Sequence, residues 1–218
     1  MFTGLIETIG TVVASARRGA SLRLRADLGG AAEGVRPGDS IALNGVCQTV
    51  CAVDGTVAEF DSVAETLART TVADWRPGTR VNVERSLSPG DRLGGHFVAG
   101  HVDGVGRVVE NGEGKGGWRL RIEAPESLLP EIAPKGSIAV DGVSLTVVEA
   151  TAEGVSVALI PTTLRETTLG SMASGDRVNL ETDLLAKYVR RALAHLAGGG
   201  TGDRRLLAAL RQSGFLES

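Results

Sequence analysis

The 218-residue sequence lacks the features that mark several large classes of protein. Its 23 Lys and Arg against 26 Asp and Glu give a net charge of −3, which argues against the basic surface of a nucleic-acid binder. No apolar run approaches the roughly 20 residues that a membrane-spanning helix needs. Two cysteines are too few for a disulfide framework, and the start Met1-Phe2-Thr3-Gly4 has no signal-peptide pattern. We therefore expect a cytoplasmic protein.

Aromatic residues are also scarce, at 3% of the chain, so the core must be built from Val, Leu, Ile and Ala. Glycine is abundant instead, with 30 residues, about twice the usual share of ~7%. Short Val-, Thr- and Leu-rich segments alternate with Gly, Pro, Asp and Asn, which predicts short strands and tight turns. These predicted strands are Gly10–Val13, Leu22–Ala26, Ile41–Leu43, Val46–Val53 and Val81–Glu84. Closely spaced short strands are typical of a small barrel or sandwich.

The chain contains a long internal repeat. Ser40–Val50 and Ser137–Val147 are identical at seven of eleven positions, at an offset of 97 residues. The same offset relates Gly78–Glu84 to Gly175–Glu181, and near the start the offset is 96. A period this long indicates a duplicated domain, because solenoid repeats run ~20–50 residues. We predict two homologous halves, 1–95 and 96–185, followed by a tail, 186–218, without a counterpart.

The tail shows the clearest helical periodicity. One apolar stripe on the predicted helix consists of Leu184, Leu185, Tyr188, Val189, Ala192, Leu193 and Leu196. Gly198-Gly199-Gly200 should end this helix, and a second short amphipathic segment follows at 206–210. Such a stripe either packs on its own barrel or forms a contact between subunits.

Each half carries a strong hairpin signal, Asn44-Gly45 or Asp141-Gly142. A two-residue turn fixes the register, so that Leu43 pairs with Val46 and the second hairpin pairs in the same way. One face of the first hairpin is then apolar apart from Gln48. The opposite face is small and polar in both halves, with Ser40, Ala42, Cys47 and Thr49 in the first half and Ser137, Ala139, Ser144 and Thr146 in the second.

The small polar face is either a solvated surface or a ligand surface. Solvated strands usually carry Lys, Glu and Arg, which are missing here, so we favour contact with a planar ligand that has hydrogen-bonding edges. The halves differ at positions where chemistry would occur. Cys47, Leu5, Gly38 and Ser86 are matched by Ser144, His101, Lys135 and Asp183, respectively. Unequal groups in two equivalent pockets suit a reaction that treats two similar molecules differently.

Other readings of these residues are simpler. Cys51 is expected to be a small buried hydrophobic residue. His96 and His101 lack the ligand spacing of a zinc site, so an acid–base or orienting role is favoured over a metal. Asp183 stands where it could cap the tail helix.

Six sequence blocks identify a resemblance, and they occur in series over residues 1 to about 190. They are MFTGLIE, GDSIALNGVCQTV, GGHFVAGHVDGVG, KGSIAVDGVSLTV, LIPTTLRETTLG and VNLETDLLAKYVRR. Together they resemble the riboflavin synthase family, of the type with duplicated lumazine-binding domains. The resemblance implies an all-β fold with two tandem six-stranded Greek-key β-barrels plus a C-terminal α-helix.

The resemblance also implies an activity. Members of this family are transferases that convert two molecules of 6,7-dimethyl-8-ribityllumazine into riboflavin and 5-amino-6-ribitylamino-uracil, without cofactor or metal. The family resemblance implies a homotrimer, held by the tail helix, with each active site between the first barrel of one subunit and the second barrel of a neighbour. It leaves open an association with lumazine synthase. The alternative is a non-catalytic lumazine- or flavin-binding protein of the same fold.

Site residues follow from the resemblance, residue by residue. The candidate catalytic residues are Cys47, His96, His101, Ser144 and Asp183. The first barrel's pocket and the N-terminus would contribute Phe2, Thr3, Gly4, Leu5, Ile6, Ser40, Cys47, Gln48, Thr49, Asp61, Ser62, Val63, Ala64, Glu65 and Thr66. The second pocket would contribute Gly100, His101, Val102, Lys135, Ser144, Leu145, Thr146, Ala158, Leu159, Ile160, Pro161, Thr162 and Thr163.

Two of these positions depart from the family pattern. Gln48 stands where the family usually has Leu, and we expect it at the barrel rim with a solvated amide or in contact with the ligand through its backbone. Thr162 replaces a longer polar side chain, which bears on affinity rather than on reaction type.

Overall fold

The computed structural model describes residues 1–114, 116–197, 208 and 210–212. Residues Met1–Asp183 form one compact unit that contains two barrels, and a second unit begins at Leu184. The first barrel has the strands β1 (Thr8–Arg18), β2 (Ser21–Asp27), β3 (Ser40–Leu43), β4 (Val46–Asp54), β5 (Val57–Ser62) and β6 (Arg80–Arg85). The second has β7 (Gly104–Gly114), β8 (Gly117–Glu123), β9 (Ser137–Val140), β10 (Val143–Ala150), β11 (Gly154–Leu159) and β12 (Arg177–Thr182).

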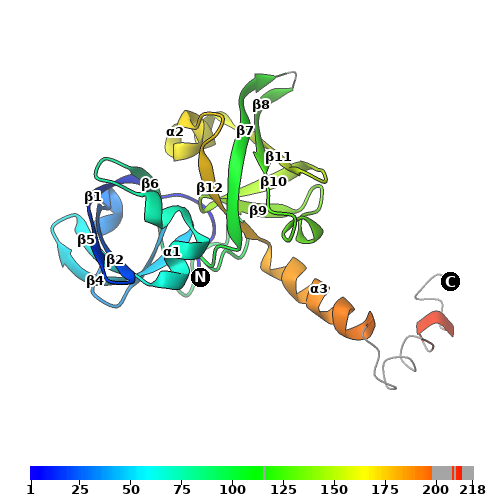
Figure 1. Cartoon of the computed structure of the whole chain (residues 1–218), viewed down its shortest axis with the longest axis horizontal. Coiled ribbons are helices and arrows are strands. Elements are labelled where there is room, and N and C mark those ends of the chain that lie inside the picture. Colours follow the sequence, from blue (N-terminus) through cyan, green and yellow to red (C-terminus); the bar gives the residue numbers. More distant parts are fainter. Residues whose placement is uncertain (115, 198–207, 209, 213–218) are drawn as a thin grey trace. The chain divides into compact units, whose positions relative to one another are not determined.

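Both barrels are closed and antiparallel, with equivalent strand orders. The first follows β1-β2-β5-β4-β3-β6, and the second follows β7-β8-β11-β10-β9-β12 around the ring. Closure pairs every edge strand, and the order is that of a Greek key. Figure 1 shows the first barrel in blue to cyan and the second in green to yellow. The predicted fold of two six-stranded barrels in tandem is confirmed.

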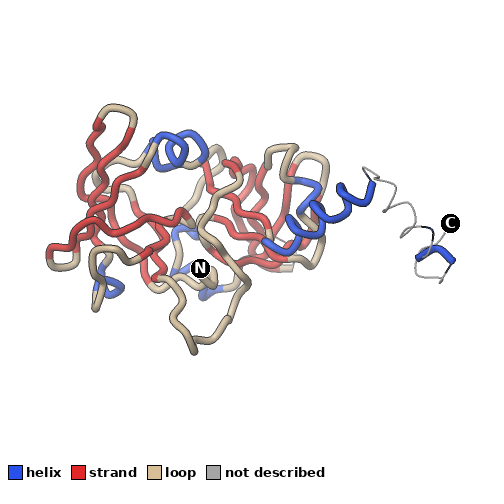
Figure 2. The backbone as a smooth tube through the Cα atoms, turned by 90° about the horizontal axis from the view of Figure 1, so that it is seen from below, coloured by secondary structure: helices blue, strands red, loops and turns tan. Residues whose placement is uncertain are grey.

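Short helices follow the fifth and eleventh strands, each with a 3₁₀ turn after it, and two further 3₁₀ turns lie between β2 and β3 and between β8 and β9 (Figure 2). The helices are α1 (Ala64–Arg69) and α2 (Pro161–Glu166), and the 3₁₀ turns are η1 (Gly29–Ala32), η2 (Thr71–Asp74), η3 (Leu129–Glu131) and η4 (Thr168–Ser171). The equivalent placement of α1 and α2 extends the internal repeat beyond the strands.

The hairpin register predicted from the two turns is confirmed. Leu43 pairs with Val46 and Ser40 with Thr49, and in the second barrel Val140 pairs with Val143. Bulges also recur at equivalent places, at Val50–Ala52 in β4 and Val147–Glu149 in β10. Since a bulge bends a strand and increases its twist, the repeated bulges help both barrels to curl in the same way.

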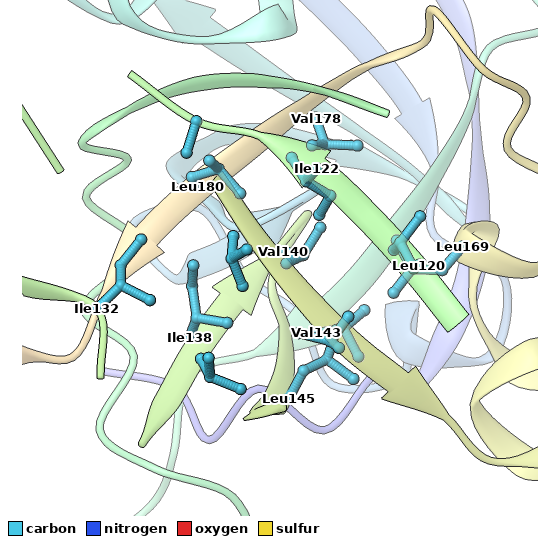
Figure 3. Packing of buried hydrophobic residues seen from close by; sticks show 14 of the residues in the cluster. Leu120, Ile122, Ile132, Ile138, Val140, Val143, Leu145, Leu169, Val178 and Leu180 are labelled. Carbon is cyan, nitrogen blue, oxygen red and sulfur yellow. The ribbon is translucent and has the colours of Figure 1, made fainter. Parts of the chain in front are cut away.

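Each barrel has its own aliphatic core. Figure 3 shows the second core, where side chains such as Leu120, Ile138 and Leu180 from different strands point toward one another. The first core is similar, except that Gln48 takes the position of Leu145. Gln48 is 4% exposed and its Nε2 has no hydrogen-bond partner among the described residues, so the predicted solvated amide at the rim is wrong.

The two barrels meet through their hairpin turns. A Cβ on Gly45 would lie 2.6 Å from the Gly142 nitrogen, and one on Gly142 would lie 2.7 Å from the Gly45 nitrogen. Both glycines also have positive φ, of 75° and 79°, so the joint requires glycine at both turns.

A reciprocal pair of asparagines completes this joint. Asn82 Nδ2 donates to the Asp141 carbonyl across the joint, and Asn179 Nδ2 donates to the Asn44 carbonyl, both at 2.9 Å. The side-chain oxygens of Asn82 and Asn179 each accept a backbone N–H from the opposite half as well. The barrels are therefore joined by buried hydrogen bonds that repeat about a pseudo-twofold axis.

The predicted tail helix is present as α3 (Leu184–Ala197). Four large side chains of its apolar stripe are exposed, namely Leu185, Tyr188, Val189 and Leu193, whereas Leu184 and Leu196 are half-buried. The predicted glycine stop at 198–200 lies outside the described residues, as do Leu206 and Leu207 of the second amphipathic segment. Among the described helices, none has the length and apolarity to cross a membrane.

Candidate functional site

Two equivalent strips of small and polar side chains lie on the outer faces of the barrels. The first strip consists of Ser40, Cys47, Thr49, Asp61 and Val63, and the second of Ser137, Ser144, Thr146, Ala158 and Ile160. Continuation of the β4–β5 register sets Thr49 beside Asp61, and the β10–β11 register sets Thr146 beside Ala158.

Each strip includes one exposed apolar side chain. Val63 is 59% exposed, and Ile160 at the equivalent position is 61% exposed. An apolar platform beside hydroxyl and thiol groups suits a planar heterocycle with polar edges.

The strips differ in charge at one end. Arg23 donates two hydrogen bonds to the Asp61 carboxylate, of 2.6 and 2.5 Å. These hydrogen bonds keep the pKa of Asp61 below its ordinary value. The second barrel pairs Arg119 with Ala158 at this place, so Arg119 has no carboxylate across from it and contacts Ser156 Oγ at 3.4 Å. Sequence reasoning missed Arg119, although the repeat aligns it with Arg23.

A serine and a histidine come together at the second strip. Ser144 Oγ lies 2.7 Å from His96 Nδ1, and the His96 backbone N–H donates to the Thr3 carbonyl. Burial lowers the pKa of His96, and the nearby charge of Asp183 partly opposes this. The imidazole is therefore held neutral at ordinary pH and can accept a proton from the serine hydroxyl. His96 Nε2 is buried without a partner among the described residues.

The N-terminal segment, residues 2–6, and its repeat, residues 98–102, cross the joint between the barrels; we call them the crossing segments. The Gly4 carbonyl accepts a hydrogen bond from Ser144 N of the second barrel at 2.8 Å, and the Gly100 carbonyl accepts one from Cys47 N of the first at 2.9 Å. Ile6 packs on the second core and Val102 on the first. The sequence analysis assigned Gly4 to the first pocket and Gly100 to the second. In the structure the Gly4 carbonyl instead binds the second barrel, and the Gly100 carbonyl binds the first.

Several expected binding residues have side chains turned away from the strips. Phe2 is fully buried with Ala42, Val98 and Ala139, and Thr3 is 7% exposed. Four others point into the barrels because they alternate with strip residues: Gln48, Ser62, Leu145 and Leu159. These residues can shape the strips through packing.

The remaining expected residues are exposed or half-buried around the strips. Leu5 and His101, the equivalent residues after Gly4 and Gly100, are both exposed. Ala64, Glu65 and Thr66 begin α1, whereas Pro161, Thr162 and Thr163 begin α2.

Lys135 is exposed and has a φ of 66°, a conformation that costs a side-chain-bearing residue energy and that Gly38 adopts in the first barrel. Strain of this kind is often retained where a side chain serves a ligand.

Cys51 was expected to be buried and is exposed, so that interpretation is wrong. Its exposure follows from the regular alternation of β4, which turns Cys51 outward together with Thr49 and turns Val50 into the core. Its Sγ contacts the Thr49 carbonyl at 3.7 Å and Asp61 Oδ2 at 3.9 Å.

A polar groove of about 690 Å³ near the first strip is bordered by Ser40, Thr3, Glu84 and the segment Ser86–Ser88. Another groove of about 720 Å³ lies by Arg119 and Ser156 on the second barrel. Within the described ranges, no three His, Cys, Asp or Glu side chains cluster closely enough to hold a metal ion.

Comparison with known proteins agrees with the duplicated architecture. The lumazine binding domain family matches residues 3–86 and again residues 99–183. Riboflavin synthase from Actinobacillus pleuropneumoniae is 37% identical over 215 residues, which span 99% of this chain and all of that protein. The chain belongs to the riboflavin synthase family. Riboflavin synthases are transferases, and riboflavin synthase from Mycobacterium tuberculosis is 48% identical over 200 residues, spanning 88% of this chain and 98% of that protein.

Solved structures of a related protein share the fold of this riboflavin synthase family member. LumP complexed with riboflavin has a TM-score of 0.76 and 27% identity, and LumP complexed with 6,7-dimethyl-8-(1'-D-ribityl) lumazine has a TM-score of 0.76 and 24% identity. Both matches cover 84% of this chain and 99% of LumP.

Proposed function

We propose that the chain makes riboflavin from two molecules of 6,7-dimethyl-8-ribityllumazine. One molecule gives a four-carbon unit to the other, and 5-amino-6-ribitylamino-uracil is released. The atoms of the two substrates equal those of the two products, so the reaction needs no external oxidant or reductant. Riboflavin synthases of 37–48% identity and the lumazine- and riboflavin-bound LumP structures support this proposal.

The observation that carries the proposal is a pair of equivalent strips with unequal reactive groups. The first strip presents the Cys47 thiol, and the second presents the Ser144 hydroxyl with His96 beside it. Two molecules of one substrate can therefore occupy similar surfaces and meet different chemistry. A binding protein without turnover would have no use for this difference.

The Ser144–His96 pair suits a proton-transfer step. A substrate ring on the second strip is attacked at an electrophilic carbon by Ser144 Oγ, or by a water that Oγ holds, while His96 Nδ1 takes the proton. The pair keeps the proton within the site, where it can return when the bond breaks. The 7-methyl group of the other lumazine is acidic because its carbanion delocalises into the ring, and holding two rings face to face lowers the barrier further.

The strips are open surfaces, which supports a site shared between subunits. We propose a homotrimer, held by the exposed apolar stripe of α3, in which a first strip of one subunit faces a second strip of its neighbour. Changing Leu193 on the stripe to Glu should give smaller species by light scattering and lower turnover. Ala194→Glu, on the opposite side of α3, should keep both. A fully active monomeric Leu193→Glu variant would contradict the shared site.

The function is tested by mixing the purified protein with the lumazine and following riboflavin absorbance. One riboflavin should form for every two lumazines consumed, in the presence of a chelator and without NAD(P)H. A ratio of one to one, or a requirement for metal or NAD(P)H, would overturn the proposal. We propose that this reaction takes place in the cytoplasm, and co-purification would test an association with lumazine synthase.

A second candidate is a non-catalytic lumazine- or flavin-binding protein, because LumP has the same fold. The lower identity to LumP, 24–27%, and the presence of Cys47, Ser144 and His96 favour the enzyme. Tight lumazine binding without riboflavin formation would reverse this choice.

A further inference from the structure

Two carboxylates outside the expected site are buried in equivalent positions of the barrels. Glu84 in β6 is 4% exposed and Glu181 in β12 is 3% exposed. The internal repeat aligns them, yet sequence reasoning gave neither a function. Burial of a carboxylate costs free energy unless it is well hydrogen-bonded, so both require an explanation.

Each carboxylate holds one of the segments that cross the joint. Glu84 Oε1 accepts hydrogen bonds from Thr3 N and Thr3 Oγ1, both at 2.6 Å, and Oε2 accepts one from Gly4 N at 3.0 Å. Glu181 Oε1 accepts from Ala99 N at 2.7 Å and Oε2 from Gly100 N at 3.0 Å. In both cases the two oxygens bind successive backbone N–H groups, the second of them from a glycine with positive φ.

The crossing segments then reach the reactive residue of the opposite barrel. The Gly4 carbonyl accepts from Ser144 N, and a Cβ on Gly4 would lie 2.6 Å from Ser144 Cβ. The Gly100 carbonyl accepts from Cys47 N, and a Cβ on Gly100 would lie 2.7 Å from Cys47 Cβ. Such close packing transmits any displacement of the glycine to the residue it touches.

We propose that Glu84 of the first barrel is a positioning residue for Ser144 of the second, and that Glu181 of the second is a positioning residue for Cys47 of the first. The assignment to ligand sites rests on the proposed function, but the cross-barrel coupling itself does not. Each strip is thus shaped by the carboxylate of the other half. In two independent domains, by contrast, each carboxylate would act on the strip of its own barrel.

The carboxylate form suits this task. Burial raises the pKa of Glu84, and the hydrogen bonds from Thr3 and Gly4 oppose that rise. A glutamine of the same shape has one acceptor oxygen, and its NH₂ group would face a backbone N–H. Glu84→Gln and Glu181→Gln therefore loosen one segment each without creating a cavity.

The test measures thiol reactivity, which needs neither substrate nor turnover. In a Cys51→Ser background, Cys47 is the sole thiol of the chain. We expect Glu181→Gln to raise the rate of Cys47 alkylation by iodoacetamide roughly tenfold, since losing a charged hydrogen bond favours local opening. Glu84→Gln should leave that rate within about twofold.

A matched second experiment places the single thiol on the second barrel, at position 144. With Cys47→Ser, Cys51→Ser and Ser144→Cys combined, Glu84→Gln should raise the alkylation rate and Glu181→Gln should not. Coupling within the same barrel, or equal effects of both variants on both thiols as in general unfolding, would overturn the proposal. Because no lumazine is present, this result is independent of whether riboflavin forms.

A kinetic readout connects the coupling to the site. Glu84→Gln and Ser144→Ala should be non-additive in kcat, whereas Glu84→Gln and Cys47→Ala should be additive. Glu181→Gln should show the opposite pattern. Additivity in all four pairs would contradict the positioning role even if the thiol rates change.

Discussion

The acid at the turn of the second hairpin should make stability depend on pH. Asp141 is 1% exposed, and burial raises its pKa from 3.8 to about 7, against the effect of a hydrogen bond from Asn179 N. The folded state therefore binds this proton more tightly than the unfolded state. The stability that results is present below pH 3.8 and is lost as the pH rises through about 7.

The first hairpin supplies a natural replacement. Asn44 occupies the same place, and its Oδ1 accepts from Asn82 N at 2.6 Å just as Asp141 Oδ1 accepts from Asn179 N at 2.7 Å. Asp141→Asn should keep this hydrogen bond and remove the titration. Its advantage over the parent should grow with pH by up to about 1.4 kcal/mol per unit and reach at most about 4 kcal/mol near neutrality.

Urea unfolding of both proteins between pH 4 and 8, at one protein concentration, measures this difference. The reverse variant Asn44→Asp should acquire the same dependence and so serves as a matched control. If Asp141→Asn and the parent respond to pH in parallel, burial does not control this carboxyl.

Three further expectations follow from the packing and the site. Gln48→Leu, which copies Leu145, should raise the free energy of unfolding by about 1–3 kcal/mol, because it removes a buried Nε2 that has no hydrogen-bond partner in the described part of the chain. A lower melting temperature would mean that this group has a partner in solution. Gly45→Ala should destabilise far more than Gly55→Ala: both have positive φ, but a Cβ on Gly55 meets open space, so equal losses would contradict the tight joint. His96→Gln should lower kcat at least about tenfold with little change in riboflavin affinity by fluorescence titration, and an effect on affinity alone would remove His96 from the proton transfer.

Local chemistry predicted most of the barrels. Asn44-Gly45 and Asp141-Gly142 fixed two hairpins because a two-residue turn leaves one register, and alternation then separated the core from the strips. The same alternation turns Cys51 outward, so the expectation of a buried Cys51 rested on its residue type alone. The bulge beside it could not be predicted, because it depends on how the closed barrel bends rather than on the local sequence.

Which barrel each crossing segment packs on could not be predicted for a different reason. The repeat establishes that Gly4 and Gly100 are equivalent, but that equivalence is the same whether each segment packs on its own barrel or on the other. The hydrogen bonds from Ser144 N to the Gly4 carbonyl and from Cys47 N to the Gly100 carbonyl decide between these arrangements, and they join residues far apart in the sequence. Only tertiary structure contains that information.

The pseudo-twofold joint has a consequence for how the two halves can diverge. Gly45 and Gly142, and likewise Asn82 and Asn179, contact the opposite half, so a change in one copy disturbs a partner in the other. At the exposed part of the strips the copies already differ, as Asp61 and Ala158 do. A gene duplication with this geometry keeps the joint between the halves symmetric, while the exposed residues of the two strips diverge in function. Protein engineers seeking new ligands can therefore vary the exposed residues of one strip while keeping Cys47 and Ser144, whose backbone N–H groups bind the opposite half.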